Sequence, residues 1–276
     1  ARAKTSTDQA VLDWPGNNVK SSALKSTYLP QEWKNGRVVL QDGQKTLLFQ
    51  DPVEVVAISN PQDVEQALST ITHGVNRNGY YAAGFITYEA AAVYNLATHE
   101  PPADSLPVLW FGLYEERQEI DVESTGSGSY EVGEWEAALN WPAYGAAIAA
   151  IKRYIARGHT YQVNYTMPLR ASFSGDPWAF YRDLSRSQQA DYMAYIDLGR
   201  FVVCSSSPEL FFWRNGELLT SKPMKGTAPR GRTLAEDRAQ MGWLKISEKN
   251  RAENVMIVDM IRNDFGRFAD TGSVEV

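Results

Sequence analysis

The sequence predicts an α+β fold in which strands occur in groups and helices stand between the groups. This grouping favours hairpins and meanders over a regular repeat of strand, helix and strand. Asp42-Gly43 and Asn215-Gly216 each separate two short apolar runs and so indicate tight hairpin turns. The chain has 276 residues, 43% of them apolar, which is enough for one large core or two smaller ones.

Residues 36–123 contain the first group of expected strands and one helix, after a polar and irregular segment at 1–35. Asn60-Pro61 predicts the start of the helix, because asparagine caps a helix and proline fits its first position. Asn78-Gly79 predicts its end. The apolar residues that share one face of this helix are Val64, Ala67, Leu68, Ile71 and Val75. Strands are expected at 37–40, 45–49, 53–58, 80–88 and 106–114.

A Ser/Gly-rich stretch at 124–131 predicts a linker, and we expect 132–276 to be the first part of a further domain. Trp141-Pro142 opens a helix that Arg157-Gly158 ends, and Asp176-Pro177 opens another. Further strands are expected at 160–171, 192–198, 200–205, 210–213 and 218–220. The last two helices are expected at about 234–246 and 248–262.

The composition argues against several classes of protein. A formal net charge of −6 disfavours a nucleic-acid partner, which normally requires a basic face. No run of about eighteen apolar residues could span a bilayer. The single cysteine, Cys204, lies in an apolar run and is expected to be a small buried side chain in a reducing cytoplasm. Three histidines cannot form a Cys/His zinc cluster, so any metal is expected to be oxygen-bound.

Lys225 is the first candidate for chemistry, because it lies between Pro223 and Gly226 directly after an expected strand. Proline fixes the entry of the chain, and glycine allows close approach of the backbone. This placement is typical of a nucleophilic lysine, although a loop lysine in a turn has the same local pattern. A free lysine has a pKa near 10.4, so attack at neutral pH requires a lower pKa.

Two further segments carry polar side chains that could line a site. In the expected strand at 160–171, Gln162, Asn164 and Thr166 share one face, which fits either a lined cavity or an ordinary half-buried strand. Glu209 precedes an apolar run, so we expect it to be partly desolvated. Desolvation raises the pKa of a carboxyl group, as a general acid requires. The alternative is a glutamate at a strand start that binds nearby backbone amides.

The last expected helix places acidic and amide side chains on shared faces, Asn250 with Glu253 and Asp259 with Asn263. Glu253 lies beside an apolar stretch and has no lysine four residues after it, which makes it a candidate ligand for Mg²⁺. A solvated helix residue is the ordinary alternative. Arg262, Asn263 and Asp264 fit helix capping or a structural salt bridge as well as they fit a site.

Four motifs occur in the order and spacing of the chorismate-utilising enzymes. They are Gln162-Val163-Asn164, Ser207-Pro208-Glu209, Pro223-Met224-Lys225-Gly226-Thr227, and Ala252-Glu253-Asn254-Val255-Met256-Ile257-Val258-Asp259 with Arg262-Asn263-Asp264. The chain most resembles component I of the aminodeoxychorismate synthase branch, and segment 83–90 is similar as well. The resemblance implies an α+β fold with two packed, mainly antiparallel sheets and surrounding helices. It also implies a Mg²⁺ ion that grips a carboxylate of chorismate.

The resemblance implies a role for each candidate residue. Lys225 attacks ring carbon two while Glu209 protonates the departing hydroxyl at carbon four, and ammonia then enters at carbon four and expels the lysine. Glu253 binds the metal. Gly226 and Thr227 contact the substrate, with support of the backbone as the alternative. Desolvation and a neighbouring divalent cation both lower the pKa of a lysine in such a site.

Two positions distinguish the branches of the family. Isochorismate and salicylate synthases have a lysine that activates water where this chain has Gln162, and anthranilate synthases usually have alanine at the position of Lys225. The implied function is a transferase-type synthase that converts chorismate to 4-amino-4-deoxychorismate for para-aminobenzoate and folate synthesis in the cytoplasm. A glutamine amidotransferase subunit supplies the ammonia. Anthranilate synthase component I and a noncatalytic fragment or homologue are the alternatives.

The family's chorismate-binding domain continues beyond the motifs found here, with further metal-binding glutamates. We therefore expect a remainder after Val276. We also expect the chain as written neither to bind chorismate tightly nor to turn it over, which titration calorimetry with chorismate and Mg²⁺ tests.

Overall fold

The chain folds into two compact units. The structure is a computed structural model that describes residues 2–4, 36–43, 45–100, 104–122, 126 and 128–276. Most of the polar segment 1–35 and part of the predicted linker lie outside the described residues. One unit consists of Ala1–Asp121 with Ser187–Val276, and the other consists of Val122–Arg186.

The described residues of the first unit form three sheets, and every strand pair in them is antiparallel. The five-stranded sheet has the order β13 (Val202–Ser207), β12 (Tyr192–Asp197), β2 (Arg37–Asp42), β3 (Lys45–Phe49) and β7 (Gln118–Glu119). A three-stranded sheet has the order β4 (Glu54–Ile58), β6 (Leu109–Tyr114) and β5 (Tyr81–Ile86). The third sheet has the order β1 (Arg2–Lys4), β15 (Leu218–Lys222) and β14 (Leu210–Asn215).

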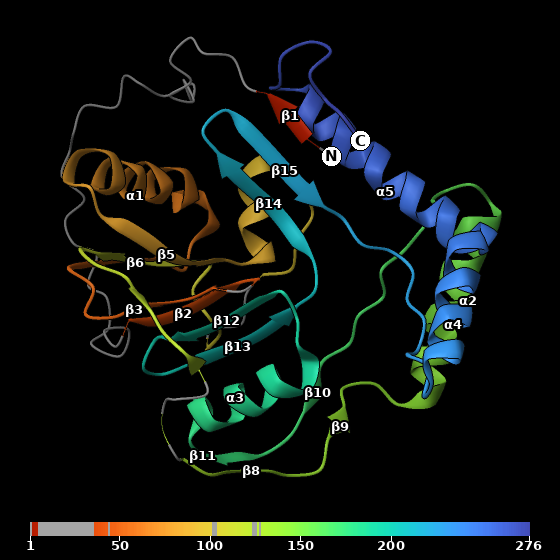
Figure 1. The fold of residues 1–276 in the computed structure, drawn as a ribbon, viewed down its shortest axis with the longest axis horizontal. Helices are drawn as coiled ribbons and strands as arrows, with labels where there is room; N and C mark the ends of the chain where they lie inside the picture. The colour runs from red at the N-terminus through yellow and green to blue at the C-terminus, as the bar shows by residue number, and fades with distance from the viewer. Residues whose placement is uncertain (1, 5–35, 44, 101–103, 123–125, 127) are drawn as a thin grey trace. The chain divides into compact units, whose positions relative to one another are not determined.

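The helices of this unit are α1 (Val64–Asn78), α4 (Leu234–Ile246) and α5 (Glu248–Gly266), with 3₁₀ segments η2 (Pro61–Asp63) and η3 (Tyr88–Tyr94) (Figure 1). Antiparallel sheets grouped with separate helices confirm the predicted α+β class. The last two helices have the predicted positions, although α5 continues four residues beyond its predicted end.

Two of the sheets pack face to face over one apolar core, as the resemblance predicts. Val38 and Phe49 of the five-stranded sheet belong to the same buried cluster as Trp110 and Tyr114 of the β4-β6-β5 sheet. Trp110 and Tyr114 are completely buried. The Tyr114 hydroxyl donates a hydrogen bond of 2.6 Å to the carbonyl of Gly36, which ties β6 to the residue that precedes β2.

Helix α1 packs against the opposite face of the β4-β6-β5 sheet. Ala67 and Ile71 share a second buried cluster with Leu113 of β6. The side chain of Asn60 accepts a hydrogen bond of 3.1 Å from the backbone amide two residues later and so opens η2, which leads into α1. Gly79 ends the helix with a left-handed φ of 73°. The predicted start and end of this helix are therefore confirmed. Its predicted buried face is confirmed except at Val75, which is exposed.

The described residues of the second unit form two short strand pairs and two helices. Its elements are β8 (Tyr130–Val132), β9 (Glu136–Ala137), α2 (Trp141–Ala156), β10 (Leu169–Arg170), β11 (Phe173–Gly175) and α3 (Pro177–Gln188), the end of which passes the unit boundary. Strand β8 pairs with β11, and β9 pairs with β10. Asn140 and Asp176 cap the two helices at their predicted starts, each accepting a backbone hydrogen bond of 2.9 Å.

The predicted strand at 160–171 is wrong. Residues 161–168 have no regular secondary structure, and only Leu169–Arg170 forms a strand within this range. An alternation of polar and apolar side chains describes the two faces of a strand, but a strand also needs a neighbour for its backbone hydrogen bonds. Among the described residues, none pairs with 161–168 in a sheet.

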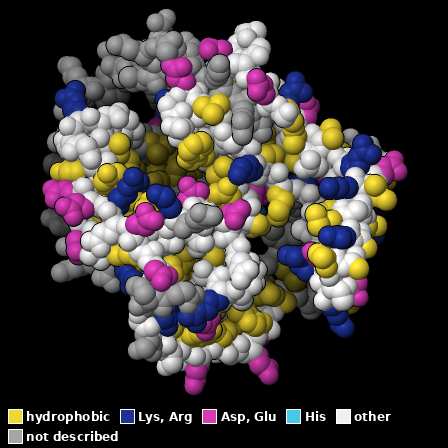
Figure 2. Space-filling view, in the orientation of Figure 1, with side chains coloured by type: hydrophobic (Ala, Val, Ile, Leu, Met, Phe, Trp, Pro, Cys, Tyr) yellow, Lys and Arg dark blue, Asp and Glu magenta, His cyan; other side chains and the backbone are white. Residues whose placement is uncertain are grey.

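The surface carries charges of both signs. Figure 2 shows Lys and Arg side chains interspersed with Asp and Glu side chains on the face that it draws. Within the part of the chain that the structure describes, no helix is both long enough and apolar enough to cross a membrane.

Candidate active site

The hairpin of β14 and β15 brings Glu209 beside the segment that carries Lys225. Leu210 pairs with Lys222 at the open end of this hairpin, so the residue before β14 and the residues after β15 emerge side by side. The backbone amide of Met224 donates a hydrogen bond of 3.0 Å to Oε1 of Glu209. Two motifs that are fifteen residues apart in the sequence therefore meet at this end of the sheet.

Glu209 is partly buried, as predicted. The hydroxyl of Ser207 shapes the turn before it, since this hydroxyl accepts from the Glu209 amide and donates to the Glu209 carbonyl, both at 3.2 Å. The bond from Met224 corresponds to the alternative interpretation, in which the glutamate binds a backbone amide. Within the described residues, Oε2 has no hydrogen-bond partner, so the carboxyl group can still act on a substrate.

Lys225 lies in an irregular segment that joins β15 to α4. Its side chain is partly buried, and among the described residues it forms no hydrogen bond or ion pair. Gly226 is also partly buried, whereas Thr227 is exposed. The amine of Lys225 is therefore not committed to a structural contact, which a nucleophile requires.

Gly226 lies close to α5. Its φ of 80° lies in the left-handed region, which favours glycine. A Cβ atom at this position would lie 3.0 Å from Oδ1 and 3.1 Å from Cβ of Asn250, closer than ordinary van der Waals contact. Asn250 stands in the first turn of α5, and its Nδ2 donates a hydrogen bond of 3.0 Å to the hydroxyl of Ser247, the N-cap residue.

The far end of the segment is attached to α4. Arg230 forms hydrogen bonds of 2.7 and 2.9 Å to the two carboxylate oxygens of Asp237, and the Gly231 amide donates to the same carboxylate at 3.0 Å. The Arg230 guanidinium and then the Gly231 amide hold the pKa of Asp237 below its usual value. Thr233 and Glu236 form a capping box at the start of α4. The segment with Lys225 is thus held near both of its ends.

Glu253 lies three residues after Asn250 on α5, so the two side chains project from neighbouring positions of one helix face. It is partly buried and pairs with Lys249 at 3.7 Å. An ion pair of this i,i+4 type contributes only about 0.3–0.5 kcal/mol, so it competes weakly with a metal ion. In the described ranges, no group of three or more His, Cys, Asp or Glu side chains is arranged to hold a metal.

Gln162 lies in the second unit, whereas Lys225, Glu209 and Glu253 lie in the first. It is partly buried between exposed neighbours, and its carbonyl accepts a hydrogen bond of 3.0 Å from the Thr160 hydroxyl. Within the first unit, the structure places Glu209 beside the segment of Lys225, and Gly226 against the helix that carries Glu253. That these residues and Gln162 form one site stays a prediction.

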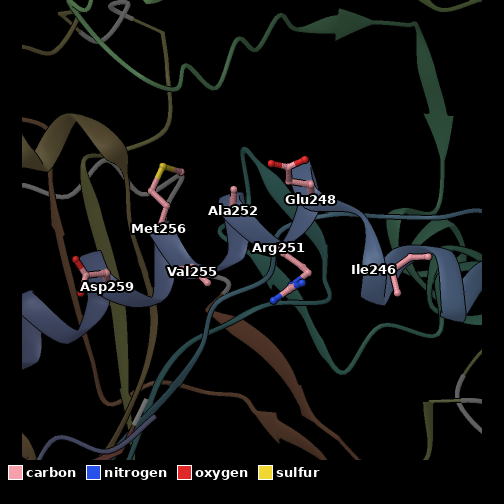
Figure 3. Close-up of a pocket in the computed structure, with 7 residues that line it drawn as sticks. All are labelled: Ile246, Glu248, Arg251, Ala252, Val255, Met256 and Asp259. Atoms are coloured by element: carbon pink, nitrogen blue, oxygen red, sulfur yellow. The ribbon is translucent and has the colours of Figure 1, made fainter.

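A separate pocket of about 650 Å³ lies on another face of α5 (Figure 3). Its lining residues are Ile246, Glu248, Arg251, Ala252, Val255, Met256 and Asp259. On α5 these residues recur at intervals of three and four and so form one stripe, while Asn250 and Glu253 project from the other side of the helix. The pocket therefore does not coincide with the site around Lys225.

The contact of Asn250 with Gly226 was not predicted from the sequence. The sequence places Asn250 only beside Glu253 on the same helix. The sequence does indicate that Asn250 lies in the first turn of a capped helix, because a serine three residues before a hydrogen-bonding side chain is typical of such a turn. The local sequence does not indicate that Asn250 lies against Gly226, which is twenty-four residues away.

Comparison with known proteins agrees with the motifs and the fold. A family model described as chorismate binding enzyme matches residues 30–276. Aminodeoxychorismate synthase component 1 of Klebsiella aerogenes is 42% identical over 143 residues, which make up 51% of this chain and 32% of that protein. Anthranilate synthase component 1 of Saccharolobus solfataricus is 31% identical over 209 residues, 70% of this chain and 50% of that protein.

The fold is similar to that of a solved protein at lower sequence identity. The structure of anthranilate synthase component I from Streptococcus pneumoniae matches 91% of this chain and 65% of that chain, with a TM-score of 0.67 and 18% identity. The chain spans about a third of the length of the aminodeoxychorismate synthase components that it matches.

Proposed function

The chain belongs to the chorismate-binding enzyme family, and we propose that the protein that contains it converts chorismate to 4-amino-4-deoxychorismate. The observation that carries this proposal is the partly buried, uncommitted side chain of Lys225, which directly follows an amide held by Glu209. The similarity to proteins named aminodeoxychorismate synthase supports the same reaction.

The first step uses Lys225 and Glu209. The neutral amine of Lys225 forms a bond to ring carbon two, both ring double bonds shift by one position, and the bond between carbon four and its hydroxyl breaks. Glu209 gives its proton to the departing oxygen, which leaves as water, and the resulting carboxylate takes a proton from the new secondary ammonium group. No charge or proton is left over at the end of this step.

The second step releases the lysine. Ammonia forms a bond to carbon four, both double bonds shift back, and the bond between carbon two and the nitrogen of Lys225 breaks. Glu209 returns a proton to the departing amine and accepts one from the incoming nitrogen. We propose that a glutamine amidotransferase partner supplies the ammonia, in keeping with relatives named as component 1 of a synthase.

The remaining candidates bind and orient the substrate. Gly226 and Thr227 are proposed to contact chorismate next to Lys225, and Gln162 is proposed to line the site without activating water, because an amide is not a base. Glu253 is proposed as one carboxylate ligand of Mg²⁺. A single protein carboxylate suits this ion, which commonly takes its other ligands from substrate oxygens and water and, when bound, neutralises substrate charge.

The test uses the intact protein, chorismate, MgCl₂ and ammonium chloride, with the products separated by chromatography. We expect 4-amino-4-deoxychorismate to form, and we expect Lys225→Ala to lower kcat at least about a hundredfold because the covalent route is lost. Unchanged amination by Lys225→Ala would reject the nucleophile.

Anthranilate synthase is the second candidate, because the Saccharolobus solfataricus relative matches a larger share of this chain than the Klebsiella aerogenes relative does. Anthranilate formation releases pyruvate, whereas 4-amino-4-deoxychorismate retains the enolpyruvyl group. Pyruvate released in proportion to anthranilate, identified as the ortho isomer, would therefore favour the second candidate over the first.

A further inference from the structure

The position of Lys225 is set by contacts on both of its sides. Before it, the Met224 amide is held by Glu209 at 3.0 Å. After it, Gly226 lies against Asn250 so closely that a Cβ atom would meet three side-chain atoms of Asn250 at 3.0 to 3.1 Å. A residue between two such contacts has little freedom to shift along the segment.

Asn250 is itself held in one orientation. Its Nδ2 donates to the hydroxyl of Ser247 at 3.0 Å, and this hydroxyl also caps the first turn of α5 by accepting from the Asn250 amide at 3.5 Å. With Nδ2 directed at Ser247, Oδ1 is the atom nearest to the Gly226 position. The carboxamide therefore presents a fixed surface to the segment that carries Lys225.

The same helix turn connects Asn250 to the proposed metal ligand. Asn250 and Glu253 are three residues apart on α5, so any displacement of the segment along Asn250 also changes the separation of Lys225 from Glu253. A nucleophile must lie close to its productive position, because an error of about 1 Å can reduce the rate about a hundredfold.

We propose that Asn250 is a positioning residue for the Lys225 amine, acting through Gly226. This inference rests on the proposed function, because it assigns Asn250 to the reaction of Lys225 with chorismate. Asn250 does not touch the reacting atoms. It holds the backbone next to Lys225 and so sets where the amine meets the ring.

Kinetics of the intact protein test this role. We expect Asn250→Ala to lower kcat for ammonia-dependent amination about 10- to 100-fold while the KM for chorismate changes less than about threefold. Asn250→Asp has the same shape and can accept a hydrogen bond from Ser247, so we expect its kcat at its own pH optimum to remain within about fivefold of wild type. Asn76→Ala, the same change at an exposed position of α1, is the matched control.

A double variant separates positioning from independent structural effects. Gly226→Ala places a methyl group against Asn250 and displaces the segment, so adding Asn250→Ala to it should reduce kcat by less than about threefold further. If the kcat of the double variant instead falls by the product of the two single-variant reductions, the two residues do not act through one contact and the inference is wrong.

Acylation of the lysines gives a readout that does not need turnover. N-hydroxysulfosuccinimide acetate is applied to the folded protein, and peptide mass spectrometry compares Lys225 with the exposed Lys152. We expect Asn250→Ala to change the relative rate of Lys225 acylation at least about threefold. An unchanged rate would reject the inference whatever the amination assay gives. Absence of amination by the wild-type protein, with the acylation rate altered as expected, would instead reject the proposed function.

Discussion

Replacing Glu209 with glutamine separates the two roles that the site assigns to this side chain. One role is mechanical, because Oε1 accepts the hydrogen bond from the Met224 amide at 3.0 Å. The other is the proposed transfer of a proton to the departing hydroxyl. Glutamine keeps a carbonyl oxygen that can accept from the amide, but it has no acidic proton. Alanine removes both the acceptor and the proton.

The magnitudes of the two losses differ enough to be told apart. A hydrogen bond to a charged acceptor is worth about 1.5–3 kcal/mol and a neutral one about 0.5–1.5 kcal/mol. Because Glu209 is only partly buried, values at the lower ends apply. Glu209→Gln is therefore expected to lower the free energy of unfolding by less than about 1 kcal/mol, and Glu209→Ala by about 1–2 kcal/mol. Loss of a general acid typically costs about 10²- to 10⁴-fold in rate.

The assay combines steady-state amination with urea denaturation of the intact protein. Glu209→Gln should lose about 10²- to 10⁴-fold in kcat with nearly wild-type stability, and Glu209→Ala should be at least as inactive and also less stable. A Glu209→Gln variant with more than a tenth of wild-type kcat would refute the proton-donor role. If Glu209→Ala were as stable as Glu209→Gln, the hydrogen bond to Met224 would not be the anchor inferred from its geometry.

Three further predictions concern the fold that supports the site. The Arg230 guanidinium holds the pKa of Asp237 below its usual 3.8, so this carboxylate stabilises the fold above pH 3.8 and the contribution is lost as the pH falls through the lower folded-state value. Asp237→Asn should therefore have a lower free energy of unfolding in urea than wild type at pH 7, and this difference should shrink as the pH falls below 3.8. A difference in unfolding free energy that stays constant with pH would contradict this. Tyr114→Phe leaves the buried carbonyl of Gly36 without its donor and should cost about 1–3 kcal/mol in urea denaturation, whereas unchanged stability would show that the bond contributes nothing. Burial raises the pKa of Cys204 to about 11, so iodoacetamide at pH 8 should alkylate the native protein at least about tenfold more slowly than the urea-unfolded protein, and equal rates would refute protection by the fold.

Features that depend on neighbouring residues in the sequence were predictable. The start and end of α1 follow from Asn60-Pro61 and Gly79, and its buried face follows from the spacing of Ala67 and Ile71. Each of these signals acts within one or two helical turns, so no distant partner is needed to interpret it.

Features that depend on a partner strand or helix were not predictable from the sequence. Residues 161–168 alternate like a strand but have no described partner, so alternation alone misassigned them. The sequence identified Glu209 and Lys225 separately. Glu209 accepts a hydrogen bond from the amide of Met224, the residue before Lys225. This bond can be inferred only after β14 and β15 have been paired from their turn to their open end. Asn250 illustrates the same limit, because its contact with Gly226 depends on how α5 packs against a distant irregular segment.

The proposed mechanism requires a covalent bond between Lys225 and chorismate, which intact-protein mass spectrometry can detect. The protein is incubated with chorismate and MgCl₂ without ammonia, quenched in acid and digested to locate any modification. We expect an adduct on Lys225 with the mass of chorismate less one water, and we expect ammonium chloride to remove it. Amination that proceeds at the wild-type rate in Lys225→Ala, or an adduct on a different lysine, would rule out Lys225 as the nucleophile.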